Sequence, residues 1–145
     1  MKVLIALLLL VSNYTYAQFN PSAITIARDS FGVPHIFAPT DPEVAYGIAW
    51  AHAEDDFETL QLVVLSGKAR LGTALGRKGA EGDYVINLLR VRQTVDEQWN
   101  TLSPDFLALI KGYVAGLNAY AAQHPDKVKY KNAFPFDEKE YMTAV

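Results

Sequence analysis

The first regular pattern along the chain is an alternation of apolar and other residues over 24–27. Ile24 and Ile26 alternate with less hydrophobic neighbours, and this period of two is typical of a half-buried strand. The segment 29–32 supplies turn residues, and 33–38 is a second short extended piece. We therefore predict a β-hairpin, with Pro34 at an edge or at a position that needs no hydrogen-bond donor.

A long helix is predicted to follow from Thr40 to about Gly67. The segment 40–43 reads Thr-Asp-Pro-Glu, which fits a capping box in which the Thr40 hydroxyl accepts from the Glu43 amide. Apolar residues then recur at spacings of three and four, which predicts one buried helix face rather than a ligand-binding motif. That face is formed by Tyr46, Trp50, Ala53, Phe57, Leu60 and Val64.

The segment 67–82 combines five glycines with lysines and arginines. A phosphate-binding loop would need a Gly-Lys-Ser/Thr ending after a strand, and neither is present. Glycines at this density favour turns, so we predict a loop here.

Two further helices are predicted over 84–102 and from Ser103 to His124. Ser103-Pro104-Asp105 combines a capping side chain with proline at the first helical position. Gly112 and Gly116 lie about one turn apart and would let a second element approach the helix closely. The predicted apolar face consists of Phe106, Ile110, Tyr113, Leu117 and Tyr120.

The remaining residues predict a loop and one more helix start. Pro125 to Pro135, with Lys127, Lys129 and Lys131, reads as a loop or exposed edge. Asp137-Glu138 begins a helix. The residues before Val145 lack a polar or Gly/Pro-rich fade, so we interpret the chain as a truncated precursor.

The first residues are typical of a secretory signal peptide. Lys2 precedes an uninterrupted apolar run from Val3 to Val11, which is far shorter than the about 20 residues that cross a bilayer. We predict a signal over 1–17, cleaved between Ala17 and Gln18. The mature chain is then expected in the periplasm or outside the cell, and no later segment is both long and free of charge.

Composition excludes several classes of chemistry. The formal net charge is −3, and the charge balance gives no indication of a nucleic-acid partner. The chain contains no cysteine, so disulfides and thiolate ligands or nucleophiles are excluded. Stability must therefore come from burial of apolar side chains.

A cluster of polar residues on the long helix offers the first candidate chemistry. His52 and Asp56 are four residues apart and could face each other, with Glu54, Asp55 and Glu58 nearby. Such residues could form an acid/base pair or a metal site, but the second histidine of a zinc-protease motif is missing. A helix face ordered by ion pairs is the favoured interpretation.

The other polar candidates also favour structural roles. His35 could orient a substrate, but a histidine between Pro34 and Ile36 more often bonds to its surroundings. There is no Gly-x-Ser-x-Gly motif, and Ser66, Ser103 and His124 lie at helix boundaries. We predict no catalytic residue and no metal ligand within this chain.

The order of several motifs resembles the opening of penicillin acylase family precursors. The run Arg-Asp-Ser-Phe-Gly-Val-Pro-His-Ile over 28–36 is followed by Tyr46-Gly47 and by Ala-His-Ala-Glu-Asp over 51–55. Later landmarks lie at 67–72, 102–104 and 112–119. One departure is Asp56, where the family often has arginine, so that the ion pair of that arginine must be replaced or lost.

The resemblance implies an α+β fold that is part of a four-layer αββα sandwich of the N-terminal nucleophile hydrolase type. Residues 18–145 would be the N-terminal part of the small subunit, mostly helical with a short N-terminal hairpin. The partner would be the large catalytic subunit cut from the same precursor. The nucleophile, a serine activated by its own α-amino group, would lie beyond Val145.

By the same resemblance, the expected activity is hydrolysis of a linear amide, such as a β-lactam side chain or an N-acyl homoserine lactone. Small-molecule acyl amides would be the substrates, with pocket residues near and beyond the end of this chain. Calcium is expected in the full enzyme, mainly on the larger subunit, and no cofactor is expected in this segment.

Two alternatives remain open from the sequence. The chain could belong to a non-catalytic exported binding protein on the same framework, which the residue at the new N-terminus would discriminate. It could also be a complete small helical domain, which would unfold cooperatively as a monomer.

Overall fold

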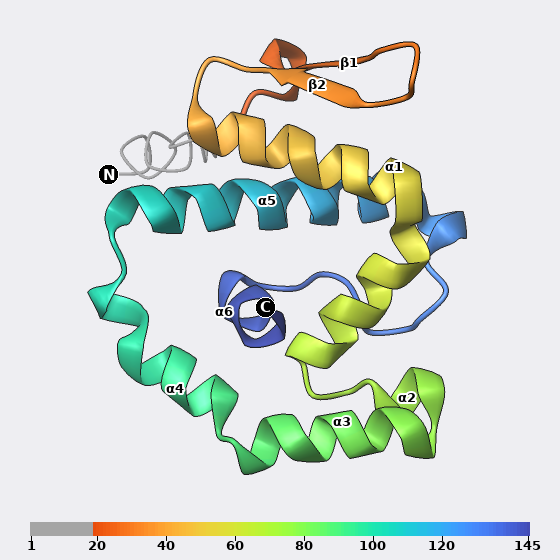
Figure 1. Cartoon of the computed structure of the whole chain (residues 1–145), viewed down its shortest axis with the longest axis vertical. Coiled ribbons are helices and arrows are strands. Elements are labelled where there is room, and N and C mark those ends of the chain that lie inside the picture. Colours follow the sequence, from red (N-terminus) through yellow and green to blue (C-terminus); the bar gives the residue numbers. More distant parts are fainter. Residues whose placement is uncertain (1–18) are drawn as a thin grey trace, which may run out of the picture.

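A computed structural model describes residues 19–145 as a mostly helical unit with one β-hairpin. The predicted signal peptide and its junction at Ala17 and Gln18 lie outside the described residues. The hairpin lies on one side of α1 (Asp41–Gly67), which runs beside α5 (Pro104–Gln123) (Figure 1). Helices α2 (Gly72–Leu75), α3 (Arg77–Leu88) and α4 (Val91–Gln98) form a rim around α6 (Glu138–Ala144). Within residues 19–145, no helix has the length and hydrophobicity that a membrane span needs.

The predicted hairpin is confirmed. Strands β1 (Thr25–Arg28) and β2 (Pro34–Phe37) are antiparallel, with Ile26 opposite Ile36. A short 3₁₀ helix, η2 (Pro21–Ala23), precedes them. A Cβ atom on Gly47 of α1 would lie 2.6 Å from the Ile36 side chain. The hairpin therefore packs on α1 where α1 carries no side chain.

Helix α1 (Asp41–Gly67) confirms the predicted long helix but not its predicted capping box. The Thr40 hydroxyl donates to the Glu43 carboxylate at 2.9 Å instead of accepting from the Glu43 amide. The other carboxylate oxygen of Glu43 accepts from the Asn20 amide at 3.4 Å. A charged carboxylate is a strong acceptor, so the hydroxyl proton is directed to it.

A kink at Asp56 divides α1 and was not predicted (Figure 1). Asp56 has φ −151° and ψ 71°, outside the helical region. Its carboxylate accepts from the Thr59 amide at 3.1 Å, as an N-cap residue does. The apolar residues keep their helical spacing across the break, so periodicity alone did not reveal it.

The predicted loop over 67–82 is wrong in its larger part. Helices α2 (Gly72–Leu75) and α3 (Arg77–Leu88) occupy this region. A Cβ on Gly79 would lie 2.4 Å from the Leu71 carbonyl oxygen, so this glycine permits close packing of the two helices. Only Gly76, with φ +61°, uses the backbone freedom that suggested turns.

The predicted helix over 84–102 is interrupted. After α3 ends, Arg90 adopts a left-handed conformation with φ +55°, and α4 (Val91–Gln98) begins directly after it. The 3₁₀ helix η3 (Trp99–Thr101) completes the segment.

Helix α5 (Pro104–Gln123) begins and ends as predicted. The Ser103 hydroxyl accepts from the Phe106 amide at 3.2 Å, and His124 follows the last helical residue. Added Cβ atoms at Gly112 and Gly116 would lie 2.0 and 2.4 Å from carbonyl oxygens of α1. The predicted close approach is confirmed, and the two helix backbones nearly touch.

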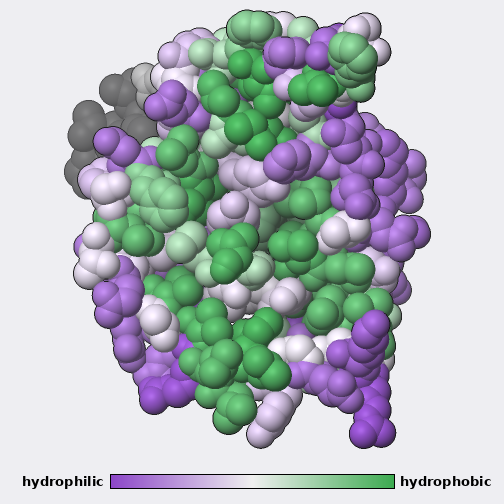
Figure 2. All heavy atoms as spheres, viewed as in Figure 1, coloured by the Kyte–Doolittle hydropathy of each residue, from purple (hydrophilic) through white to green (hydrophobic). Residues whose placement is uncertain are grey.

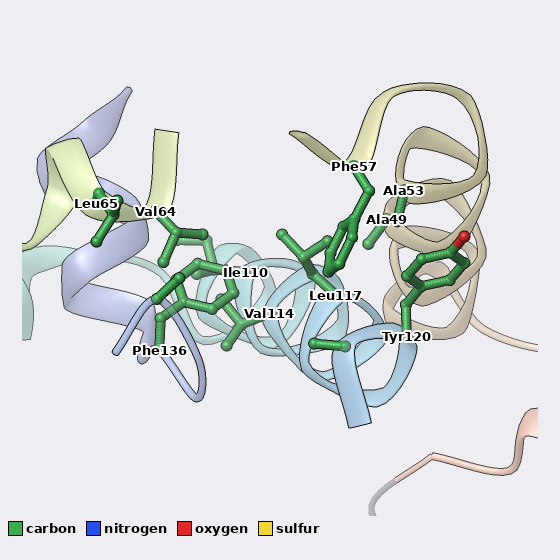
Figure 3. Close-up of a cluster of buried hydrophobic side chains, with 12 residues drawn as sticks. Ala49, Ala53, Phe57, Val64, Leu65, Ile110, Val114, Leu117, Tyr120 and Phe136 are labelled. Atoms are coloured by element: carbon green, nitrogen blue, oxygen red, sulfur yellow. The ribbon is translucent and has the colours of Figure 1, made fainter. Parts of the chain in front are cut away.

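The core lies between α1, α5 and the C-terminal segment (Figure 3). A loop that includes η4 (Pro125–Lys127) leads to α6 (Glu138–Ala144), which begins with a capping box on Asp137. Of the five residues predicted to form the apolar face of α5, Ile110, Leu117 and Tyr120 are buried, whereas Phe106 is 42% exposed. The buried core comprises Ala49, Ala53, Phe57, Val64, Leu65, Ile110, Val114, Leu117, Tyr120, Ala121, Ala133 and Phe136.

Candidate functional site

The carboxylates that precede the kink in α1 bind Arg28 of the hairpin. Its guanidinium lies 3.1 Å from Glu54 and 2.8 Å from Asp55. The hydrogen bonds to Glu54 and then to Asp55 raise the pKa of Arg28. The same side chain donates to the Gly32 carbonyl at 2.9 Å. These carboxylates therefore join the hairpin to the helix and are not poised for proton transfer.

His52 and Asp56 do not form the pair that their spacing suggested. The His52 Nδ1 atom lies 3.1 Å from the Tyr113 hydroxyl on α5. Burial and the nearby Tyr141 raise the pKa of Tyr113 to about 12, so this hydroxyl stays protonated at neutral pH. Hydrogen bonds from the Thr59 side chain and amide lower the pKa of Asp56. Because of the kink, Asp56 caps the second half of α1 and does not pair with His52.

Glu58, the last carboxylate of the cluster, pairs with Lys129 of the C-terminal loop. Within residues 19–145, no group of three or more His, Cys, Asp or Glu residues could hold a metal ion. Glu54 and Asp55 therefore connect α1 to the hairpin, Asp56 binds the second half of α1, and Glu58 binds the C-terminal loop.

His35 belongs to the hairpin turn. Its Nε2 atom lies 3.4 Å from the Asp29 carboxylate, which also accepts from the amides of Val33 at 3.0 Å and Phe31 at 2.9 Å. The hydrogen bond from the Val33 amide has the largest effect and that from the Phe31 amide the next largest, and both lower the pKa of Asp29. His35 thus supports the turn, which agrees with the favoured interpretation.

The hydroxyl and imidazole candidates at helix boundaries are dispersed. Ser103 caps α5, and the His124 Nδ1 atom lies 3.0 Å from the Tyr120 carbonyl at the opposite end of that helix. Ser66 lies in the last turn of α1, where its carbonyl accepts from Ala69. These three residues are not brought together as a nucleophile and its base.

A cavity of about 520 Å³ lies between the end of α1, α3, α4 and α6. Three cationic residues, Lys68, Arg70 and Arg92, line it together with one carboxylate, Glu140. The Lys68 ammonium donates to the carbonyls of Asn132 and Pro135. Glu140 lies 3.6 Å from the Lys68 ammonium and offsets part of this positive charge. Sequence reasoning missed this cavity because its walls come from segments far apart in the chain, 67–70, 86–92, 132–134 and 140–143.

The penicillin amidase family model matches residues 23–142. The chain belongs to the penicillin amidase family. The match includes the hairpin, α1 to α5, the loop between α5 and α6 and the first part of α6. The family resemblance stated from the motifs is thereby confirmed.

Two family members illustrate the range of relatives. The chain is 26% identical over 99 residues to penicillin acylase 2 proenzyme of Pseudomonas sp. strain SE83, covering 68% of this chain and 13% of that protein. It is 31% identical over 118 residues to an acyl-homoserine lactone acylase of Pseudomonas fluorescens strain Pf-5, covering 76% of this chain and 15% of that protein. The chain therefore spans about one seventh of the length of these relatives.

The fold is also found in a solved penicillin amidase family structure. A thermostable penicillin G acylase from Alcaligenes faecalis superimposes with a TM-score of 0.69 at 23% sequence identity. The superposition covers 83% of this chain and 69% of that chain. A mostly helical segment with one hairpin is thus an arrangement shared with an acylase structure.

Proposed function

We propose that this chain is the N-terminal part of an exported, self-processing acylase precursor that hydrolyses a linear amide. The observation that carries the proposal is the family match over residues 23–142, joined by similarity to a penicillin acylase proenzyme and to an acyl-homoserine lactone acylase. Export rests on the predicted signal over 1–17. The active protein would act in the periplasm or outside the cell.

In the proposed enzyme, this segment supports the catalytic residues and contributes none of them. The polar side chains considered above are engaged in ion pairs, caps and turns, which suits a covering element. A downstream serine, threonine or cysteine, exposed as a new N-terminus, would attack the amide with its own α-amino group as base. The hairpin and helices would then cover one side of a four-layer αββα sandwich completed by the large subunit.

Calcium in the full enzyme would require ligands from elsewhere in the precursor. Calcium prefers several carboxylate and carbonyl oxygens around one point. The described residues contain no cluster of three or more suitable side chains. We therefore derive no catalytic or binding step in this segment through a metal.

The test is to purify the full gene product from the exported fraction and determine its intact masses and N-termini. Two chains, one beginning with Ser, Thr or Cys, together with amine release from acyl amides, are the expected result. Replacement of that new N-terminal residue by alanine is the matched control and should abolish amine release. A single chain without activity would contradict the proposal and favour the exported binding protein.

The substrate screen follows from the two relatives. Penicillins and N-acyl homoserine lactones of increasing acyl length represent the two substrate types after which these relatives are named. The ratio of kcat/KM between them assigns the preference. We expect the pocket residues that set this ratio to lie near and beyond the end of this chain.

A further inference from the structure

Another cavity lies between the turn that follows α1 and the loop that leads to α6. Its volume is about 390 Å³, within the range of about 300–1,000 Å³ that is usual for small-molecule sites. Among the described residues, no carboxylate lines it, so the charge of its lining is positive. We call it the Arg70 cavity, and its lining residues are Arg70, Thr73, Lys129, Tyr130, Lys131 and Asn132.

Two of its three cations have no paired carboxylate in the described chain. The Lys129 ammonium pairs with a carboxylate of α1. Arg70 and Lys131 are exposed and make no ion pair within residues 19–145. Glu140 lines the neighbouring 520 Å³ cavity, which Arg70 also lines, and this carboxylate pairs with Lys68 at 3.6 Å. An anion in the Arg70 cavity would therefore meet two positive charges that no described carboxylate neutralises.

The turn after α1 fixes one wall of this cavity. Ala69 has φ +50°, at the position where helix C-termini usually have glycine. The Ala69 amide donates to the Ser66 carbonyl at 2.8 Å. The Arg70 amide donates to the Leu65 carbonyl at the same distance, and the two bonds complete a Schellman motif. This conformation is disfavoured for a residue with a Cβ, so the fold itself holds the backbone of Arg70 in place.

Side chains of α1 fix the other wall. The buried Gln61 accepts from the amides of Lys129 and Tyr130 at 2.8 and 3.2 Å. The Lys68 ammonium donates to the Asn132 carbonyl at 3.1 Å. Both walls are thus joined to the second half of α1, and the cavity does not have to form when a ligand binds. A preformed site loses less free energy in ordering its groups.

The lining supplies mainly hydrogen-bond donors. The Arg70 guanidinium is a planar fork that matches two oxygens of a phosphate, whereas the Lys131 ammonium is a mobile point charge. The Tyr130 hydroxyl and the Asn132 side-chain amide can also donate. Donors on two walls suit a tetrahedral oxyanion, because its oxygens accept hydrogen bonds from several directions.

We infer that the Arg70 cavity binds a phosphate group, with Arg70 and Lys131 as its charged ligands. The inference goes beyond the proposed acylase activity and does not depend on it. The volume of the cavity leaves room for an ester substituent beside the phosphate. Free phosphate, a soluble phosphomonoester and a phospholipid headgroup all present this chemistry, and the experiment distinguishes them.

The first test is isothermal titration calorimetry of the full exported product with inorganic phosphate at low ionic strength, because salt screens exposed charges. We expect one saturable site. Arg70→Gln and Lys131→Gln should each raise the phosphate Kd by about ten-fold or more, the effect of one lost charge-assisted hydrogen bond. The matched control is Arg77→Gln at the start of α3, where Figure 2 shows hydrophilic side chains and the Arg77 side chain is 95% exposed. It should leave the Kd unchanged.

Equal weakening by Arg70→Gln and Arg77→Gln would overturn the inference, because binding would then follow only the overall charge of the protein. Unchanged phosphate binding by both Arg70→Gln and Lys131→Gln would overturn it as well. The Arg70 side chain makes no ion pair in the described chain, so Arg70→Gln is expected to retain the fold, which circular dichroism checks. Lys131→Gln lies on the other wall and tests the site independently of the turn.

Two further probes identify the source of the phosphate group. Glycerol 3-phosphate represents a soluble phosphomonoester, and vesicles of phosphatidylcholine with or without phosphatidic acid represent a lipid headgroup. Tighter binding of glycerol 3-phosphate than of inorganic phosphate, lost in Arg70→Gln, assigns a soluble ester. Cosedimentation only with vesicles that contain phosphatidic acid, also lost in Arg70→Gln, assigns a headgroup. If none of the three probes binds to the wild type, the inference is refuted.

Discussion

At the scale of single residues, two side-chain amides fix the C-terminal loop against the helices. The Gln61 side chain on α1 donates to the Lys127 carbonyl at 3.1 Å and accepts from the amides of Lys129 at 2.8 Å and Tyr130 at 3.2 Å. Asn118 on α5 exchanges two hydrogen bonds with the backbone of Phe136. These side chains satisfy backbone groups that regular secondary structure does not.

Replacing Gln61 by leucine should release the loop at 127–130. Gln61 is 1% exposed, and its loss leaves backbone groups unpaired at a cost of about 2–4 kcal/mol. The measurement is the local opening free energy of the 129–130 amides by hydrogen exchange in the full protein. The exposed Gln98→Leu control should change it by less than about 0.5 kcal/mol, and equal effects of the two variants would refute this role.

The hairpin turn should loosen in acid because of Asp29. Hydrogen bonds from Val33 and Phe31 depress the pKa of its carboxyl, so its contribution is present above the unfolded pKa of about 3.9 and is lost as pH falls through the folded value. Corrected hydrogen-exchange protection of the Phe31 and Val33 amides should decrease over that range. An Asp29→Asn variant, which does not titrate, should show no such decrease.

At the scale of elements, the contact between α1 and α5 depends on positions without side chains. Gly116 lies under the Tyr46 carbonyl, where an added Cβ would come within 2.4 Å. On α3, by contrast, a Cβ on Gly82 would meet only the Leu71 side chain at 3.8 Å. Substitution by alanine is therefore expected to have opposite effects on stability at Gly116 and Gly82.

Gly116→Ala should destabilise the packing of α1 on α5 by about 1–3 kcal/mol, because the helices must separate. Gly82→Ala should instead leave stability unchanged or raise it by up to about 1 kcal/mol, through helix propensity. Hydrogen exchange along α5 and α3 in the two variants gives both values. A neutral Gly116→Ala would show that the helices separate without cost.

At the scale of the whole molecule, the described chain has a packed side and an open side. The packed side joins α1, α5, α6 and the hairpin, and the open side carries α3 with its exposed apolar side chains. Membership of the penicillin amidase family and coverage of only 13–15% of its relatives fit this asymmetry.

The mature exported protein should begin at Gln18. Phe19 packs against Tyr46 of α1, with ring centroids 6.0 Å apart, so the mature chain would contact the helices from its second residue. Sequencing of the exported small chain checks this start. An Ala17→Arg variant should block cleavage, because signal peptidase sites need small residues, whereas Ala17→Ser should be cleaved normally.

The sequence by itself determined the elements whose signals are local. The alternation at 24–27, the cap at Ser103, the long apolar stripe of α1 and the close-packing glycines of α5 all act within a few residues or through one helix face. The order of the family motifs was equally readable, because it needs no spatial arrangement. These features located the hairpin, α1 and α5 and gave the family.

Tertiary structure alone decided the features that depend on competing partners. Whether a glycine makes a turn or a close contact depends on what lies opposite it, so a loop was predicted over 67–82 although this segment contains α2 and the first half of α3. Thr40 and Asp56 each had two possible partners, and the three-dimensional positions of Glu43 and Thr59 selected one. Gln61 is a polar residue on a buried side of α1, and only the loop over 127–130 supplies partners for both ends of its side-chain amide.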